Sequence, residues 1–483
     1  MNIHIKLLSA ITLSSLLFSC TEDFEEMNTS PNDLTSVPYN TLITNAEISI
    51  LQAYNPILNN EATWTRYNVR DVYVDVDRYG ITGSNTNFNA YSGHLKNLQQ
   101  AIDLAVAAED NNAIAVAQIM KAYAFQNLTD WYGDIPYFEA LKADDKDNPI
   151  IYPAYDSQES IYADIIVQLK AANAMIDTSE SMGTADVVFD GDMTMWKKFA
   201  NSLLLRVYMR MSLVDPTTAQ NGIEEIMADP STYPIIDSNE SAAFKYWLPE
   251  DATYRSPYYM DPTTAAQQQN VTSAYMVDFL KTRNDLDRLA VYAEPAASSG
   301  EYVGLPLGTL GQSTQDLSIM GVAEFRSADS PTRIMRYSEV LFILAEAALN
   351  GWNVGMTAQE AYEAAITASF EEYGLDASTY LSEPLVDFNG GVDQRELIGE
   401  QKWCALYPDA AQGWAEVRRT GYPVYVATTE PVENLFPGKG TIKRKPYPYT
   451  EAISNPEGFN AAISAQPGII DEKFGAGVWW DVN

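Results

Sequence analysis

Residues 120–141 read MKAYAFQNLTDWYGDIPYFEAL, and they predict a buried helix that ends in a hydrophobic turn. Met120, Ala124 and Leu128 recur at the four-residue spacing of one helical face. The aromatic segment that follows, Asp130–Tyr137, contains one glycine and one proline, which are typical turn residues. The stretch therefore indicates a helical protein in which this turn fills part of the core.

The composition is that of a globular protein with a strongly acidic surface. Hydrophobic residues make up 46% of the 483 residues, and this length fits either two to three domains or one large helical domain. Acidic residues number 65 against 30 basic ones, which gives a net charge of −35. Such a surface repels phosphate backbones and anionic headgroups, so the charge argues against nucleic-acid binding and against adsorption to an anionic membrane.

Residues 1–19 have the features of a signal peptide. Lys6 supplies a short positive region, and the apolar stretch from Leu7 to Phe18 is too short to span a bilayer. The small residues before Cys20 resemble the lipobox of bacterial lipoproteins, in which this cysteine carries the lipid. The alternative is a secretory signal with a chance cysteine. We expect residues 20–38 to form a lipidated tether, whose early acidic cluster is similar to the export tag of surface-exposed lipoproteins.

The mature chain has few residues suited to catalysis or metal binding. His94 is the histidine that remains after the signal peptide, and Cys404 is the cysteine that remains once Cys20 is lipidated. A zinc site needs several His or Cys ligands, and a nucleophilic triad needs a histidine base. We expect His94 to have a capping or surface role at the start of a helix, and Cys404 to be an inert core thiol. The sequence thus predicts no metal, no cofactor and no catalysis.

Helical pairs dominate the chain beyond a first helix expected from Tyr39 to Tyr54. Four antiparallel pairs are expected at about residues 95–128, 157–213, 338–374 and 392–420, and they are similar to tetratricopeptide repeats. Residues 230–335 are rich in aromatic side chains and turns, which predicts a loop-rich insertion. The alternation of valine with polar residues over 72–76 suits a short strand. We expect residues 39–483 to form a single all-α domain.

Several motifs occur in the order found in a known family. They are Asp23–Asn32, Tyr132–Tyr137, Trp196–Arg206, Arg333–Ala347, Glu400–Trp403, Glu416–Arg419 and Arg444–Pro448. On these motifs, the chain resembles the SusD/RagB-like outer-membrane nutrient-binding lipoproteins. Its Trp-Trp-Asp ending is similar to a SusD-like group that differs from the starch-binding prototype.

The resemblance implies a lipoprotein of the outer membrane that is anchored through its N-terminal lipid and faces the cell exterior. It also implies a scaffold of four tetratricopeptide-like helix pairs. The partner that it implies is a SusC-like TonB-dependent transporter, over which the protein would sit as a lid. The implied ligand is an oligosaccharide, or a peptide as in some members, and no chemistry is expected.

Aromatic residues in the loop-like stretches are the candidate ligand contacts. Sugar recognition uses flat apolar rings beside carboxylates and amides, and these stretches also contain Asp, Asn and Arg. The candidates are Trp64, Tyr67, Tyr73, Tyr79, Trp247, Tyr254, Tyr258 and Tyr259. The alternative for each ring is packing within the insertion. The cluster Asp71, Asp75 and Asp77 could hold calcium, but a solvated acidic edge is the preferred interpretation because the spacing is not that of an EF-hand loop.

Three other functions stay open on the sequence alone. A surface glycoside hydrolase needs two carboxylates, and 65 acidic residues always provide a pair. A peptide-binding lipoprotein of the same family is a second alternative. A purely structural repeat adaptor is a third.

Overall fold

The computed structural model describes residues 37–54, 60–245, 247–250, 254–259, 270–466, 469–470 and 473–483. The segment Tyr39–Asn483 packs as one unit. The expected signal peptide and Cys20 lie outside the described residues. None of the helices among the described residues is long and apolar enough to cross a membrane.

Helices are the main secondary structure of the described chain, as the sequence predicts. Those of the first half are α3 (Tyr39–Tyr54), α4 (Asn60–Trp64), α5 (His94–Ala107), α6 (Asn111–Tyr132), α7 (Gln158–Met175), α8 (Met193–Arg210) and α9 (Pro216–Ala228). The next three are α10 (Ala274–Thr282), α11 (Leu286–Tyr292) and α12 (Val322–Phe325). The remaining helices are α13 (Tyr337–Leu349), α14 (Ala358–Glu371), α15 (Gln394–Ala405), α16 (Ala410–Thr420), α17 (Val424–Thr428), α18 (Glu451–Ser454) and α19 (Pro456–Ala465).

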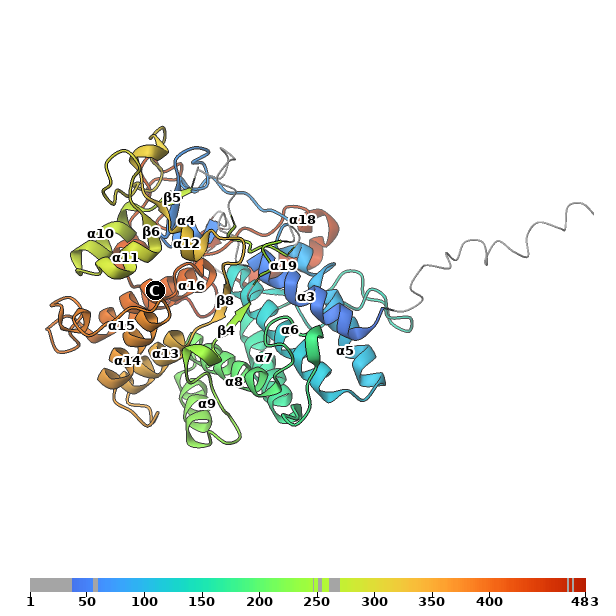
Figure 1. Cartoon of the computed structure of the whole chain (residues 1–483). Helices are drawn as coiled ribbons and strands as arrows, with labels where there is room; N and C mark the ends of the chain where they lie inside the picture. The colour runs from blue at the N-terminus through green and yellow to red at the C-terminus, as the bar shows by residue number, and fades with distance from the viewer. Residues whose placement is uncertain are drawn as a thin grey trace, which may run out of the picture. The chain divides into compact units, whose positions relative to one another are not determined.

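The four expected helix pairs are confirmed, and they pack on one another in sequence order. The pairs are α5 with α6, α7 with α8, α13 with α14, and α15 with α16. Neighbouring pairs are in contact as well, because α6 packs on α7 and α13 packs on both α8 and α15. Figure 1 shows α5 to α9, coloured blue to green, beside the orange helices α13 to α16.

Local capping residues explain where these helices begin. Thr357 and Glu360 form the predicted capping box of α14, in which each side chain bonds the other residue's backbone N–H. Asp110 caps α6 by accepting from the backbone N–H of Ala113, and Ser157 caps α7 in the same way. Gly351, at φ +82°, follows α13 where a left-handed residue ends a helix.

The strands are short and form five separate antiparallel pairs. They are β1 (Asn68–Arg70) with β5 (Asn270–Thr272), β2 (Ile135–Pro136) with β3 (Tyr155–Asp156), β4 (Ala243–Lys245) with β8 (Thr332–Met335), β6 (Ala293–Glu294) with β7 (Ile319–Met320), and β9 (Ile469–Ile470) with β10 (Phe474–Gly475). The β1–β5 pair connects residues 68–70 to the insertion, whereas the β4–β8 pair joins the two ends of the insertion.

The predicted strand over residues 72–76 is wrong. Residues 71–79 form turns instead, in which Tyr73 and Tyr79 both take positive φ angles of 55° and 67°. Asp77 folds back so that its carboxylate accepts from the backbone N–H of Arg70 at 2.8 Å. A local side-chain bond to the backbone thus replaces the ladder that the valine alternation suggested.

The insertion contains more helix than its composition indicates. Both α10 and α11 lie within it, and each starts at a capping residue, Ser273 for α10 and Asp285 for α11. These helices are short, so the insertion is still rich in loops, as the sequence predicts. In Figure 1 they lie with α12 beside α4, apart from α5 to α9.

The stretch 120–141 behaves as predicted, except that α6 continues to Tyr132. Gly133, at φ +79°, then ends the helix and donates its backbone N–H to Thr129. Asp130 is therefore helical, and its buried carboxylate accepts from Arg210 at 2.8 Å and from the hydroxyl of Tyr162. The motif anchors α6 to α7 and α8 through charge-assisted bonds.

Candidate ligand-binding site

The structure divides the eight predicted ligand contacts into buried and accessible rings. Tyr73 is 77% exposed, Tyr254 is 39% exposed and Tyr259 is half-buried. The other five are buried, and they are Trp64, Tyr67, Tyr79, Trp247 and Tyr258. A ring must present a face to solvent before a sugar can stack on it, so the accessible rings are the better candidates.

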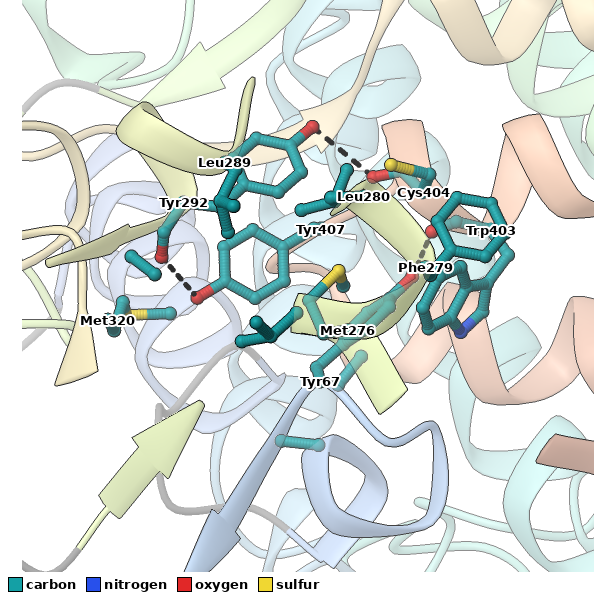
Figure 2. Packing of buried hydrophobic residues seen from close by; sticks show 14 of the residues in the cluster. Tyr67, Met276, Phe279, Leu280, Leu289, Tyr292, Met320, Trp403, Cys404 and Tyr407 are labelled. Carbon is teal, nitrogen blue, oxygen red and sulfur yellow. Dashed lines mark hydrogen bonds between the residues drawn. The ribbon is translucent and has the colours of Figure 1, made fainter. Parts of the chain in front are cut away.

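Tyr67 belongs to a core cluster, contrary to the expectation that loop-rich stretches keep their rings out of the core. Figure 2 shows it among residues of α10, α11 and α15, where its hydroxyl donates to the carbonyl of Trp403 at 2.5 Å. Its ring also packs on Tyr407, with centroids 5.3 Å apart. Tyr258 is part of the same cluster. The pairing of β1 with β5 draws this part of the chain inward, which sequence spacing cannot show.

The remaining buried rings also have packing partners. The indole nitrogen of Trp247 donates to the hydroxyl of Thr332 on β8 at 2.9 Å. Trp64 packs on Trp414 with centroids 4.7 Å apart. Tyr79 packs on Phe474 in the same manner at 6.0 Å. A ligand role for these rings stays a prediction, but each already has a structural role.

Two other sequence expectations are corrected. His94 is neither exposed nor a cap: its imidazole Nε2 lies 2.9 Å from the hydroxyl of Tyr54, and burial lowers its pKa to about 4. Asp71 and Asp77 are buried rather than solvated, and burial raises the pKa of Asp77 to about 7. Of these acids only Asp75 is exposed. No group of three or more potential metal ligands occurs among the residues that the structure describes.

Cys404 has the predicted environment of an inert core thiol. It is fully buried on α15, and burial raises its pKa to about 12. A thiol with such a pKa holds little of the reactive thiolate at neutral pH.

Tyr259 lies at a hollow of about 400 Å³ on the insertion. Ser256, three residues earlier, donates its backbone N–H to the carbonyl of Ala328, and this bond holds the 254–259 segment against the loop after α12. The hollow is lined by Tyr259, Pro295, Ala297, Thr314, Gln315, Leu317, Ile319, Val322, Arg326, Ser327 and Ala328. Apolar side chains form one part of this lining, and amide, hydroxyl and guanidinium groups form the other.

Such a lining suits a sugar. The ring of Tyr259 and the side chains of Leu317 and Ile319 are apolar surfaces for the C–H face of a pyranose. Thr314 and Gln315, from the short 3₁₀ turn Thr314–Asp316, offer a hydroxyl and an amide. These polar groups can bond sugar hydroxyls and so fix the orientation of the ligand.

A second hollow, of about 440 Å³, lies beside the turn after α6 and includes Phe88 and Tyr91. Several of its polar groups are already bonded to protein atoms. Tyr91 donates to the carbonyl of Pro136 at 2.7 Å, and Lys96 pairs with Asp144 at 2.5 Å. A ligand there would have to break these bonds, so the Tyr259 hollow is the candidate site.

Sequence reasoning found Tyr259 but not its polar neighbours. Gln315 and Arg326 come from a 3₁₀ turn and from the residue after α12, and neither carries an aromatic or periodic signal. The segment Arg255–Tyr259 contains a proline, and this proline is the sequence feature that predicts a loop position for Tyr259.

Comparisons with known proteins agree with the fold. Residues 31–448 match a family described as SusD-like, starch-binding and associating with the outer membrane. A SusD homologue from Bacteroides uniformis has a similar structure, with a TM-score of 0.77 and 25% identity over 92% of this chain and 98% of that one. A structure described as a chitin-binding SusD homologue from Flavobacterium johnsoniae gives a TM-score of 0.76 and 25% identity over 92% and 97%.

A third similar structure, a SusD homologue from Bacteroides fragilis, gives a TM-score of 0.76 and 24% identity over 92% of this chain and 99% of that one. No match was found among curated proteins.

Proposed function

Because this chain belongs to the SusD-like family of starch-binding proteins that associate with the outer membrane, we propose that it captures oligosaccharides at the cell surface and delivers them to a SusC-like TonB-dependent transporter. The Tyr259 hollow is the proposed capture site. The observation that carries this choice is the accessible Tyr259 ring beside the Gln315 amide and the Thr314 hydroxyl, for which no side-chain bond occurs among the described residues. The chitin-binding homologue makes chito-oligosaccharides one class of ligand to test.

The protein is proposed to bind its ligand without changing it. His94 is bonded to Tyr54 and Cys404 is buried, so neither supplies a nucleophile or base at neutral pH. A peptide ligand is the alternative within the same family, and a surface glycoside hydrolase is the more distant one. Incubation with glycans and analysis of the products tests for hydrolysis directly.

Anchoring through lipidated Cys20 completes the proposal. Residues 20–38 would then act as a tether between the outer membrane and the unit Tyr39–Asn483, facing the cell exterior. One or more acyl chains on a single cysteine supply membrane affinity without a spanning helix.

The test is isothermal titration of the purified chain with neutral, acidic and N-acetylated oligosaccharides, together with Tyr259→Ala. A desolvated ring in a site carries about 2 kcal/mol of binding, so the substitution should weaken binding by roughly tenfold or more. Tyr254→Ala is the matched control, because Tyr254 is exposed on the same segment but does not line the hollow. Unchanged affinity in Tyr259→Ala would refute the site. The absence of binding to every glycan would refute the function.

A further inference from the structure

Arg326 stands out among the residues that line the Tyr259 hollow. It follows the last turn of α12, to which its backbone N–H is bonded through the carbonyl of Val322. Its side chain is buried, with 6% of the residue exposed, and it forms part of the lining of the hollow. A charged group is therefore placed at the inner surface of an otherwise largely apolar cavity.

The guanidinium of Arg326 has no partner among the described residues. It forms neither a hydrogen bond nor an ion pair with them, and its Nε is fully buried without an acceptor. Other buried arginines have partners: Arg206 bonds Glu339 at 2.6 Å, and Arg419 bonds Glu346 at 2.5 Å. Arg326 is the only buried arginine in the described part of the chain for which no side-chain hydrogen bond is found.

A buried guanidinium nitrogen without an acceptor is unfavourable, and a ligand in the hollow could accept from Arg326. Burial lowers the pKa of Arg326, and Glu294 raises it by its charge without forming an ion pair. The carboxylate of Glu294 is occupied elsewhere, because it accepts the backbone N–H of Val322 at 2.8 Å. A guanidinium binds a planar anion such as a carboxylate through two parallel hydrogen bonds. The unused N–H donors of Arg326 can therefore recognise such an anion in the hollow.

A second guanidinium, that of Arg255, lies over the ring of Tyr259. The Cζ atom of Arg255 is 5.2 Å from the ring centroid of Tyr259, and its Nε donates to the carbonyl of Pro249 at 3.0 Å. One arginine therefore lies over the Tyr259 ring and another lines the same hollow, in a chain whose net charge is −35. The acidic surface repels anions in general, so an anion would bind here only by direct contact with these groups.

We propose that the Tyr259 hollow recognises an acidic sugar, a uronic acid residue whose carboxylate pairs with Arg326 while its ring lies against Tyr259. This assignment rests on the proposed function and narrows its ligand class. The apolar wall of Leu317 and Ile319 receives the pyranose, and Gln315 reaches its hydroxyls. Neutral sugars leave Arg326 unpaired and bind more weakly.

The test compares an acidic sugar with its neutral counterpart. The probes are trigalacturonate and triglucuronate, each with its fully methyl-esterified form, which keeps the ring but removes the charge. We expect each acid that binds to do so at least tenfold more tightly than its ester. Arg326→Gln should abolish this preference by weakening the acid and not the ester, while Arg326→Lys should restore part of it. Arg395→Gln is the matched control, because Arg395 is an exposed arginine that does not line the hollow.

A purely structural role for Arg326 gives a different result. Removal of an unpaired buried charge does not destabilise a fold, so Arg326→Gln should keep the melting temperature of the wild type. A marked loss of melting temperature with an unchanged preference for the acid would overturn the inference. Equal binding of acid and ester, or binding of an acidic peptide such as tri-glutamate in preference to the uronates, would also overturn it. Binding of neutral oligosaccharides alone refutes this inference but leaves the proposed function intact, whereas no binding of any glycan refutes both.

Discussion

The indole N–H of Trp480 donates to Oδ1 of Asp130 at 2.9 Å and so joins two positions 350 residues apart. The guanidinium of Arg210 lies 5.3 Å from the ring of Trp480 and binds the other oxygen of Asp130. The hydroxyl of Tyr162 and the amide of Gln126 also donate to this carboxylate, the amide at 3.0 Å. The C-terminal segment is thereby fastened to the end of α6, where the decisive sequence motif lies.

Asp130→Asn tests how much the contacts of the Asp130 carboxylate contribute to the stability of the fold. The substitution removes the charge but keeps the size of the side chain, and it leaves Arg210 with only the longer pair to Glu416 at 3.2 Å. Breaking a buried ion pair on one side costs about 3 kcal/mol or more of unfolding free energy. Urea denaturation measures this loss, with exposed Asp147→Asn as the control. A loss of less than about 1 kcal/mol would show that the other contacts suffice.

Trp247 allows a direct comparison of a structural and a ligand role. Its ring is buried and bonded to Thr332, so Trp247→Ala should destabilise the fold by about 3 kcal/mol or more. Trp247→Phe keeps most of the ring and should cost less. Thermal unfolding and glycan titration of the folded fraction separate the two roles. A stable Trp247→Ala protein that has lost binding would restore the original prediction of a ligand contact.

The contrast between Tyr67 and Tyr73 shows how far the sequence could predict the site. Capping boxes and helix periodicity are local, so the four helix pairs could be predicted from neighbouring residues. Whether a ring in a loop is buried depends on contacts with distant parts of the chain. Tyr67 is enclosed because the adjacent Asn68 pairs with Thr272, about two hundred residues later in the chain. Tyr73 instead projects from a turn in which its φ angle is positive. The place of Arg326 in the hollow could not be predicted for the same reason, because residues distant in the sequence form that hollow.

The buried imidazole of His94 predicts a specific pH dependence. Its pKa is lowered to about 4 in the folded protein, below the ordinary value of about 6.5 in the unfolded chain. Between these two pH values the unfolded chain binds more protons than the folded protein. The contribution of His94 to the free energy of unfolding is therefore complete above pH 6.5 and is lost as the pH falls toward 4. The full loss corresponds to about 3 kcal/mol.

His94→Gln isolates this effect. Asp77 and Asp409, whose pKa values burial raises to about 7 and about 6, act in the opposite direction and remain in both proteins. The difference in unfolding free energy between wild type and His94→Gln, measured by urea denaturation from pH 7 to pH 4.5, should therefore shift in favour of the variant as the pH falls. A difference that does not change with pH would contradict a neutral buried imidazole.

Membrane anchoring gives the last prediction. If Cys20 carries the lipid, Cys20→Ser should move the protein from the membrane fraction to the soluble fraction, because the single sulfur holds the acyl chains. The experiment is best done in cells that lack the transporter, since a protein partner could otherwise retain the unlipidated chain at the membrane. Cys404→Ala is the matched control: Cys404 is buried on α15, so this variant should remain in the membrane fraction. Retention of Cys20→Ser at the wild-type level would refute the lipid anchor, whereas release of both variants would point to misfolding rather than to loss of the lipid.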